Sequence, residues 1–166
     1  DVRNASYWSV LATPTAGITY GANGIWPWIR EGEEILNHRH ASGVTPWHKS
    51  INFPGSIQVG YLAEFMRTLP WWELKPAQEL LVEQPGDETF NHFISVAQTD
   101  DAEMIVAYLP IRTTIKLYNR LGREYRGRWF NPVSSDSFTA HVEYRDGLIE
   151  VTSPQDSDMI LTLTRR

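Results

Sequence analysis

The stretch GITYGANGIWPW, residues 17–28, joins a short apolar run to an irregular loop rich in aromatic side chains. Residues 18–20 are apolar enough for a buried strand, and the glycines and asparagine that follow end that pattern. The sequence therefore predicts a strand at residues 17–20 and a loop that leaves its carboxyl end. In α/β barrels, the loops at the carboxyl ends of parallel strands build the active site.

This loop carries side chains that suit a sugar ring. An indole face packs against the apolar C–H face of a pyranose or furanose, and an amide pairs with neighbouring hydroxyls. The candidate saccharide contacts are Tyr20, Asn23, Trp26 and Trp28. The alternative is that these rings close the end of a barrel and a seam between domains.

Helical patterns lie on both sides of this stretch. Residues 1–12 predict a helix that Asp1 caps and Pro14 ends. Its apolar face would hold Ala5, Trp8, Leu11 and Ala12. A second helix is predicted over residues 56–69, with Ser56 as its N-cap. Its buried stripe would hold Leu62, Phe65, Met66 and Leu69. Helix, short strand and helix in succession are typical of βα repeats.

Residues 21–54 are predicted to be a long loop, and its titratable side chains admit several roles. Among its histidines, His38 is the candidate for contact with a substrate hydroxyl. A metal site at His38, His40 and His48 is disfavoured because it needs correctly placed ligands and a supporting shell. Glu31, Glu33 and Glu34 read as a solvated charge run, with an acid or base as the alternative if the loop covers a cleft.

From residue 78 onward the pattern changes to short apolar runs separated by turns. Eight runs are predicted as strands, at residues 79–83, 93–97, 104–109, 114–118, 125–130, 138–144, 148–152 and 159–163. Asp146-Gly147 between two of them is a strong hairpin signal. The pattern predicts an antiparallel β-sandwich over residues 77–166, after a boundary near residues 70–77. The fold class is α+β.

Several other side chains have two interpretations. Trp71 and Trp72 follow Pro70 at the predicted junction and are expected to anchor the interface between the two parts, with a binding platform as the alternative. Asp156 and Asp158 suit either a calcium site or ordinary turn chemistry. The remaining histidines, His92 and His141, are expected to be ordinary sandwich residues.

Composition narrows the classes of partner. The 166-residue chain has a net charge of −5 and no cluster of basic and aromatic residues, which disfavours nucleic acid and anionic membranes. Its lack of cysteine excludes disulfides, thiolate catalysis and Cys-ligated zinc. We expect no metal and no cofactor. Because the sequence opens at Asp1, directly in a predicted helix, we expect a fragment or processed product of a longer protein.

An ordered set of motifs resembles one known family. Tyr7-Trp8, GITYGANGIWPW, Pro54-Gly55-Ser56 and Leu69-Pro70-Trp71 come in that order before a small β domain. Later motifs agree: a turn at residues 129–132, then Ser153-Pro154 and a closing strand at 158–161. The set resembles the C-terminal part of the apiosidase-like glycoside hydrolases, a (β/α)8 barrel with a β-sandwich labelled as collagen-binding. The chain departs from the family pattern at residues 133–136, Val-Ser-Ser-Asp.

The resemblance implies that the chain has two parts with different roles. Residues 1–76 would be the end of a catalytic barrel, with its last strand at 17–20 and last helix at 56–69, and residues 77–166 would be an accessory domain. The catalytic carboxylates would lie upstream of Asp1, so no catalytic residue is assigned in this chain. The expected partners are a carbohydrate and the upstream barrel segment, in a secreted or periplasmic protein. A non-catalytic module that binds glycan or protein and a purely structural domain are the alternatives.

Overall fold

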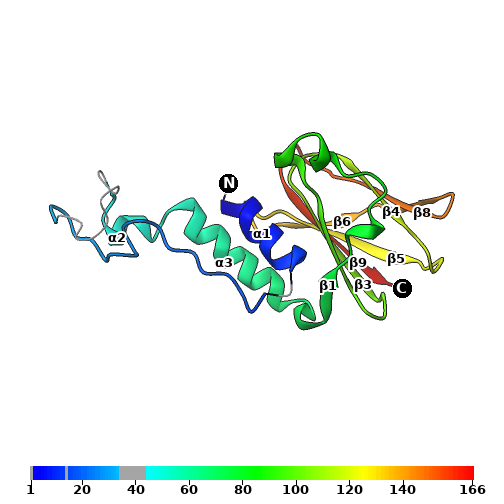
Figure 1. Ribbon diagram of the computed structural model, residues 1–166, viewed down its shortest axis with the longest axis horizontal. Helices are drawn as coiled ribbons and strands as arrows, with labels where there is room; N and C mark the ends of the chain where they lie inside the picture. Colours follow the sequence, from blue (N-terminus) through cyan, green and yellow to red (C-terminus); the bar gives the residue numbers. More distant parts are fainter. Residues whose placement is uncertain (1, 14, 34–43) are drawn as a thin grey trace.

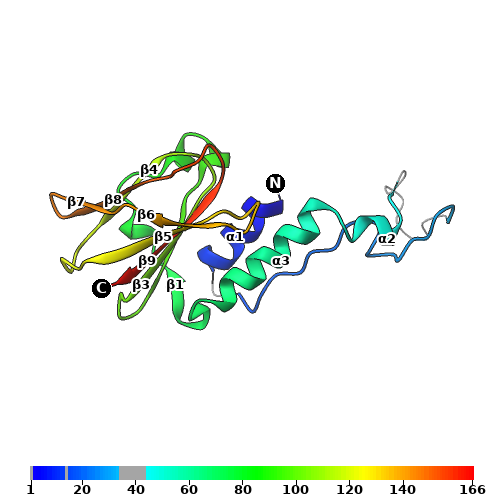
Figure 2. The same cartoon turned by 180° about the vertical axis from the view of Figure 1, so that it is seen from behind.

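The computed structural model describes residues 2–13, 15–33 and 44–166. Figure 1 shows a β-sandwich at one end and a helical arm that projects from it. Seen from behind in Figure 2, α2 (Trp47–Ser50) and a loop drawn in blue lie at the end of the arm that is far from the sandwich. Within the described residues, no helix is long and apolar enough to cross a membrane.

The sandwich consists of two antiparallel sheets. The larger has the order β1-β2-β3-β9-β5-β6, with bounds Leu74–Pro76, Ser95–Thr99, Met104–Leu109, Met159–Arg165, Tyr125–Phe130 and Ser137–Ala140. The smaller has the order β4-β8-β7, with bounds Thr114–Tyr118, Leu148–Thr152 and Glu143–Arg145. The arrangement of helices and two antiparallel sheets confirms the predicted α+β class with an antiparallel sandwich.

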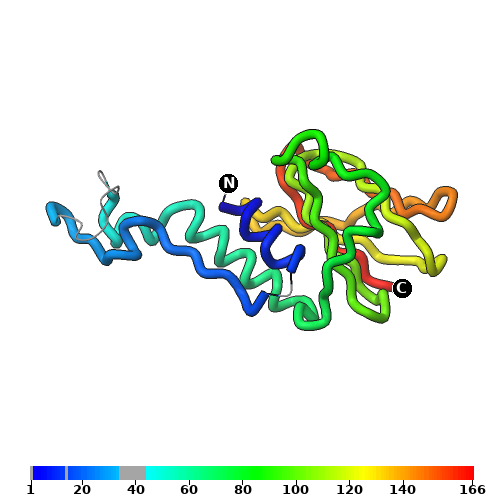
Figure 3. Tube along the Cα trace, viewed as in Figure 1, coloured from blue at the N-terminus to red at the C-terminus, as the bar shows by residue number. Residues whose placement is uncertain are grey.

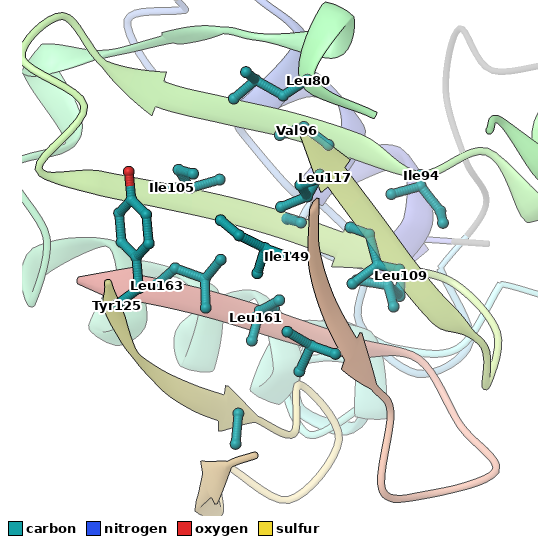
Figure 4. Packing of buried hydrophobic residues seen from close by; sticks show 14 of the residues in the cluster. Leu80, Ile94, Val96, Ile105, Leu109, Leu117, Tyr125, Ile149, Leu161 and Leu163 are labelled. Atoms are coloured by element: carbon teal, nitrogen blue, oxygen red, sulfur yellow. The ribbon is translucent and has the colours of Figure 1, made fainter. Parts of the chain in front are cut away.

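The main core lies between the two sheets. Alternate residues of β3 and β9 point into it, which the two-residue period of a strand requires. Figure 4 shows how side chains from both sheets meet there. The largest contributors include Ile105, Leu109, Leu117, Trp129, Ile149, Leu161 and Leu163. The burial of these apolar side chains is the main stabilising contribution of the sandwich.

A second core covers the outer face of the larger sheet. Helices α1 (Val2–Ala12) and α3 (Pro54–Arg67) lie on this face. Tyr7 of α1 stacks on Tyr108 of β3, with ring centroids 4.9 Å apart, and Phe65 of α3 stacks on Phe130 of β5 at 4.8 Å. The cluster also contains Leu11, Leu62, Leu69, Leu74, Val106 and Ile160. The central strands are therefore buried on both faces.

The helices differ from prediction in detail. In α1, Leu11 is buried as expected and Trp8 is half-buried, but Ala5 and Ala12 are exposed, because the helix turns Tyr7 toward β3 instead. In α3, Leu62, Phe65 and Leu69 are buried and Met66 is half-buried. Its first residue is Pro54 after Phe53, so the predicted cap at Ser56 is wrong. Proline suits this position because its fixed φ is helical and its missing N–H needs no partner.

The predicted strand at residues 17–20 is not formed in this structure. Figure 3 shows this segment running beside α3, and the structure assigns no strand to it. A strand needs a neighbour to pair its backbone groups, and the nearest neighbours of this segment are helical side chains. The apolar run alone therefore does not make a strand here.

Strand boundaries were predicted correctly at β3, β4, β5 and β8. The predicted strand 138–144 divides instead into β6, which pairs with β5, and β7, which pairs with β8. The chain changes sheets between them, a known way to form a sandwich corner. At the predicted hairpin, Asp146 and Gly147 have φ of 52° and 76°, as a type I′ turn requires.

Two further corrections concern the start of the sandwich. Residues 79–83 hold the end of a 3₁₀ turn, η2 (Gln78–Leu80), and one isolated bridge from Leu81 to Leu117. In place of a paired strand, the Gln84 side chain bonds the backbone of Ile94, just before β2, and the Gln78 side chain accepts from the Val96 N–H in β2. The predicted connector contains η1 (Trp71–Glu73) and β1. Two more turns, η3 (Pro85–Asp87) and η4 (Phe90–His92), precede β2.

Candidate functional site

The aromatic loop lies at the far end of the arm, beyond α3 and next to α2 (Figures 1 and 3). Its backbone forms consecutive turns: Ile25 N–H donates to the Ala22 carbonyl at 2.8 Å, and Ile29 N–H donates to the Gly24 carbonyl at 3.1 Å. Ala22 and Ile29 are buried beneath these turns. Trp47 N–H donates to the Ile29 carbonyl at 2.9 Å, which ties the start of α2 to the loop.

Glycine at position 24 allows this packing. A Cβ at Gly24 would lie 1.8 Å from the Thr45 carbonyl oxygen and 2.5 Å from Ser50 Oγ. Ser50 is fully buried, and its hydroxyl donates to the same Thr45 carbonyl at 2.8 Å. Residues 22–29 and 45–50 therefore form one small packed unit, which we call the arm tip.

Three tryptophans lie at the arm tip. Trp26 is 69% exposed and Trp28 is 54% exposed. Trp28 stacks on Trp47 with ring centroids 4.4 Å apart and an angle of 7° between the rings. The backbone of Trp28 has φ of 52°, a conformation that costs free energy for a bulky residue. The stack and the surrounding turns hold Trp28 in this orientation. Trp47 therefore covers one face of the Trp28 indole, while Trp26 and the rest of Trp28 leave aromatic surface exposed to solvent.

The structure brings some predicted site residues together and separates others. Trp26 lies over Gly21, where a Cβ would be 2.3 Å from its Nε1. Asn23 is exposed in the same loop. Tyr20 is half-buried, and its ring lies against Gly55 at the start of α3. His38 lies outside the described residues, as does His40.

Trp47 was missed as a site residue in the sequence. The available signal was Thr45-Pro46-Trp47, in which a proline precedes a new helical turn, within a stretch predicted as an irregular loop. His48 follows it, exposed and edge-on to the Trp47 ring at 5.8 Å. Within the described residues, no group of three His, Asp or Glu side chains is placed to hold a metal ion.

The acidic side chains of the loop have local partners. Glu31 accepts a hydrogen bond from Lys49 Nζ at 3.0 Å, and this bond lowers the pKa of the Glu31 carboxyl. Glu33 accepts from the Arg30 backbone N–H at 2.9 Å. Both are exposed, as a solvated charge run would be, and an ionised Glu31 is unsuited to act as a proton donor. Glu34 lies outside the described residues.

A groove of about 660 Å³ lies at the base of the arm, near β1. Its lining is mainly apolar and comes from α1, α3, the segment around residue 17 and the turn after α3. The residues at its wall include Val10, Ile18, Val59, Met66, Trp71 and Trp72. Trp71 and Trp72 are 45% and 66% exposed, so they do not anchor the helices to the sandwich as predicted. That anchoring comes from the second core.

Asp158 has a different role from the calcium site considered above. It is buried, and its two oxygens accept from Arg3 Nε at 2.8 Å and Nη2 at 3.0 Å. Tyr108 Oη is 2.9 Å from Asp158 Oδ2. Arg3 also donates to the Gln58 side chain at 2.9 Å, which links α1, α3 and the sandwich. With both oxygens occupied by these donors, Asp158 forms an ion pair that joins α1 to the sandwich.

Comparisons with known proteins agree with this architecture. Residues 1–73 match the family described as "Apiosidase-like, catalytic domain". No curated protein matches the chain. A solved structure named "Glycoside hydrolase" aligns with a TM-score of 0.79 and 22% identity over 98% of this chain and 36% of its own.

A second solved structure, a glycoside hydrolase family 5 protein from Bacteroides vulgatus ATCC 8482, aligns with a TM-score of 0.79 and 20% identity. The alignment covers 98% of this chain and 35% of that protein. At such identities the likeness establishes the fold. This chain, helical arm and sandwich together, therefore has the fold of about one third of two larger proteins that are named glycoside hydrolases.

Proposed function

We propose that this chain is the C-terminal portion of a glycoside hydrolase that acts on a complex carbohydrate. Residues 1–76 are the end of its (β/α)8 catalytic barrel and residues 77–166 are an accessory β-sandwich. The match of residues 1–73 to an apiosidase-like catalytic domain supports this assignment, and so does the fold shared with larger glycoside hydrolases.

The geometry of the arm supports the hypothesis that it is one part of a barrel. The segment at residues 17–20 is apolar but has no strand beside it, and Ile18 borders the apolar groove along α3. Apolar surface of this kind is normally covered in a folded domain. In the complete enzyme, the rest of the barrel would pair with residues 17–20 as the last strand and cover the groove, with α3 as the final helix.

The observation that carries the substrate proposal is the exposure of two indoles at the arm tip, Trp26 and Trp28. Indole faces stack on the apolar faces of sugar rings, and Asn23 in the same loop supplies an amide for hydroxyls. In this proposal Trp26 is the main stacking surface, because Trp28 already shares one face with Trp47. Tyr20 and His38 are the further proposed contacts.

Hydrolysis of a glycosidic bond requires two carboxyl groups on opposite sides of that bond. We assign neither of them to this chain, and in this proposal both belong to the barrel strands upstream. The division is tested by comparing the protein encoded by the complete gene with residues 1–166 alone on a panel of plant and microbial polysaccharides. Release of sugar by the longer protein, and its loss in a Trp26→Ala variant, would support the proposal. Full activity of that variant would show that the arm tip is not part of the substrate site.

The sandwich itself is best explained as a support for the barrel's last helices. The Arg3–Asp158 pair and the stack of Phe65 on Phe130 fix both helices to the sheet. A collagen-binding role has no comparable support, because Trp129, the sole tryptophan in the sequence after residue 76, is buried in the core between the sheets.

A further inference from the structure

Three arginines share one face of the larger sheet near its free edge. Arg126 and Arg128 alternate along β5 with Tyr125 and Trp129, whose side chains are buried between the sheets. The two arginines therefore point to the opposite face. Arg166 joins them, because it lies two residues after Thr164, which pairs with Arg126. The same sheet face is covered by α3 at Phe130 but is open at the arginines.

These side chains border a groove of about 740 Å³ over β5 and β6. Ser137 and Thr139 of β6 contribute hydroxyls, and Thr139 pairs directly with Arg128. A second, adjoining groove shares Arg128 and Ser137 and extends toward α3, where Glu64 lies on its wall. Together the two grooves form a channel across the end of the sheet, and its lining carries guanidinium and hydroxyl groups among apolar side chains.

The charge of the channel is opposite to that of the whole chain, which carries −5. Among the described residues, Arg126 and Arg128 have no carboxylate within 4.0 Å, whereas Arg166 has Glu124 at 3.6 Å. His141, also on the wall, has Glu143 at 3.6 Å. Two guanidinium groups thus face solvent side by side, and they are not neutralised by neighbouring acids of the sheet. Such groups pair well with carboxylates because both are planar and the bonds can be bidentate.

We propose that this channel binds an acidic polysaccharide through the carboxylates of its uronate residues. The choice of a saccharide over other polyanions rests on the proposed glycosidase function. It also fits the lining, since hydroxyl and guanidinium groups match sugar hydroxyls and carboxylates.

Binding is tested with the 166-residue chain and three kinds of polymer. Alginate and polygalacturonate carry uronates, dextran is a neutral glycan, and polyglutamate is an acidic peptide. We expect both uronate polymers to bind and dextran not to bind, with affinity that falls as salt is added. Replacing both arginines, Arg126→Gln with Arg128→Gln, should weaken uronate binding about tenfold.

Arg112→Gln is the matched control, because Arg112 is also exposed and lies outside both grooves. It should leave uronate binding unchanged, and circular dichroism should show all variants folded. No binding of either uronate polymer, or equal binding by the double variant and the control, would overturn the proposal. Equal affinity for polyglutamate would show a general polyanion surface and would also overturn it. Because Arg126→Gln with Arg128→Gln leaves the arm tip unchanged, a loss of binding in that variant is distinguishable from a loss of the substrate contact proposed for Trp26.

Discussion

Arg3 and Asp158, separated by 155 residues in sequence, form a two-pronged ion pair that joins the first helix to the last strand region of the sandwich. Asp158 is 5% exposed and Arg3 is 30% exposed. We expect Asp158→Asn to lower the free energy of unfolding by about 2 kcal/mol, less than for a fully buried pair because water reaches Arg3. Urea unfolding of Asp158→Asn, Arg3→Gln and the double variant measures this. Strictly additive effects would contradict a direct coupling.

The stacked tyrosines provide a matched pair of variants. Tyr108 Oη bonds the Asp158 carboxylate, whereas Tyr7 Oη is buried with no hydrogen-bond partner among the described residues. Tyr108→Phe should destabilise the fold by about 1.5 kcal/mol, because a buried carboxylate loses a donor. Tyr7→Phe should be neutral or slightly stabilising, since it removes an unsatisfied group. Equal losses of thermal stability in the two variants would show that hydrogen bonding by the hydroxyl does not distinguish the contributions of Tyr7 and Tyr108 to stability.

The same tyrosines predict a loss of stability at high pH. Burial raises the pKa of both phenols far above the ordinary value of about 10, and the nearby Asp158 charge raises them further. A group whose pKa is raised by folding contributes stability below its unfolded pKa and loses it as pH rises beyond that value. The free energy of unfolding should therefore fall steadily above about pH 10. Tyrosinate absorbance should show these two phenols ionising only as the protein unfolds, and early ionisation of all seven tyrosines would contradict the burial.

The attachment of the arm depends on the second core and not on the exposed tryptophan pair. Phe65 is buried against Phe130, so Phe65→Ala should cost about 3 kcal/mol. Trp72 is 66% exposed, so Trp72→Ala should change the free energy of unfolding by less than about 0.5 kcal/mol. Denaturant unfolding distinguishes the two. A large loss in Trp72→Ala would restore the interface role that its sequence position suggested.

Sequence patterns correctly predicted the structural features that depend on residues close together in the chain. The alternation along β4 and β8, the Asp146-Gly147 turn and the apolar stripe of α3 all carry their structural reason locally. The predictions failed where residues far apart in the sequence determine the local conformation or the role of a side chain. Asp158 looked like a turn or calcium residue until the fold placed Arg3 beside it, and residues 17–20 carry a strand pattern without a partner to pair with. The stack of Trp28 on Trp47 likewise needed the path of the intervening chain.

The arm tip offers a final test, because its shape depends on one glycine. A Cβ at Gly24 would lie 1.8 Å from the Thr45 carbonyl oxygen, a clash with backbone that a small shift does not relieve. Gly24→Ala should separate residues 22–29 from residues 45–50 and break the Trp28–Trp47 stack. Tryptophan emission should then shift, and a protease should cleave the tip faster.

Gly60→Ala is the matched control for this test. Gly60 lies inside α3 with open space around its Cα, so alanine there should stabilise the helix by about 0.5–1 kcal/mol and leave the tip intact. Under the proposed function, Gly24→Ala should weaken saccharide binding by the complete enzyme as strongly as Trp26→Ala, since both remove the ordered aromatic surface. Normal binding by Gly24→Ala would mean that the saccharide contacts do not depend on the packed tip.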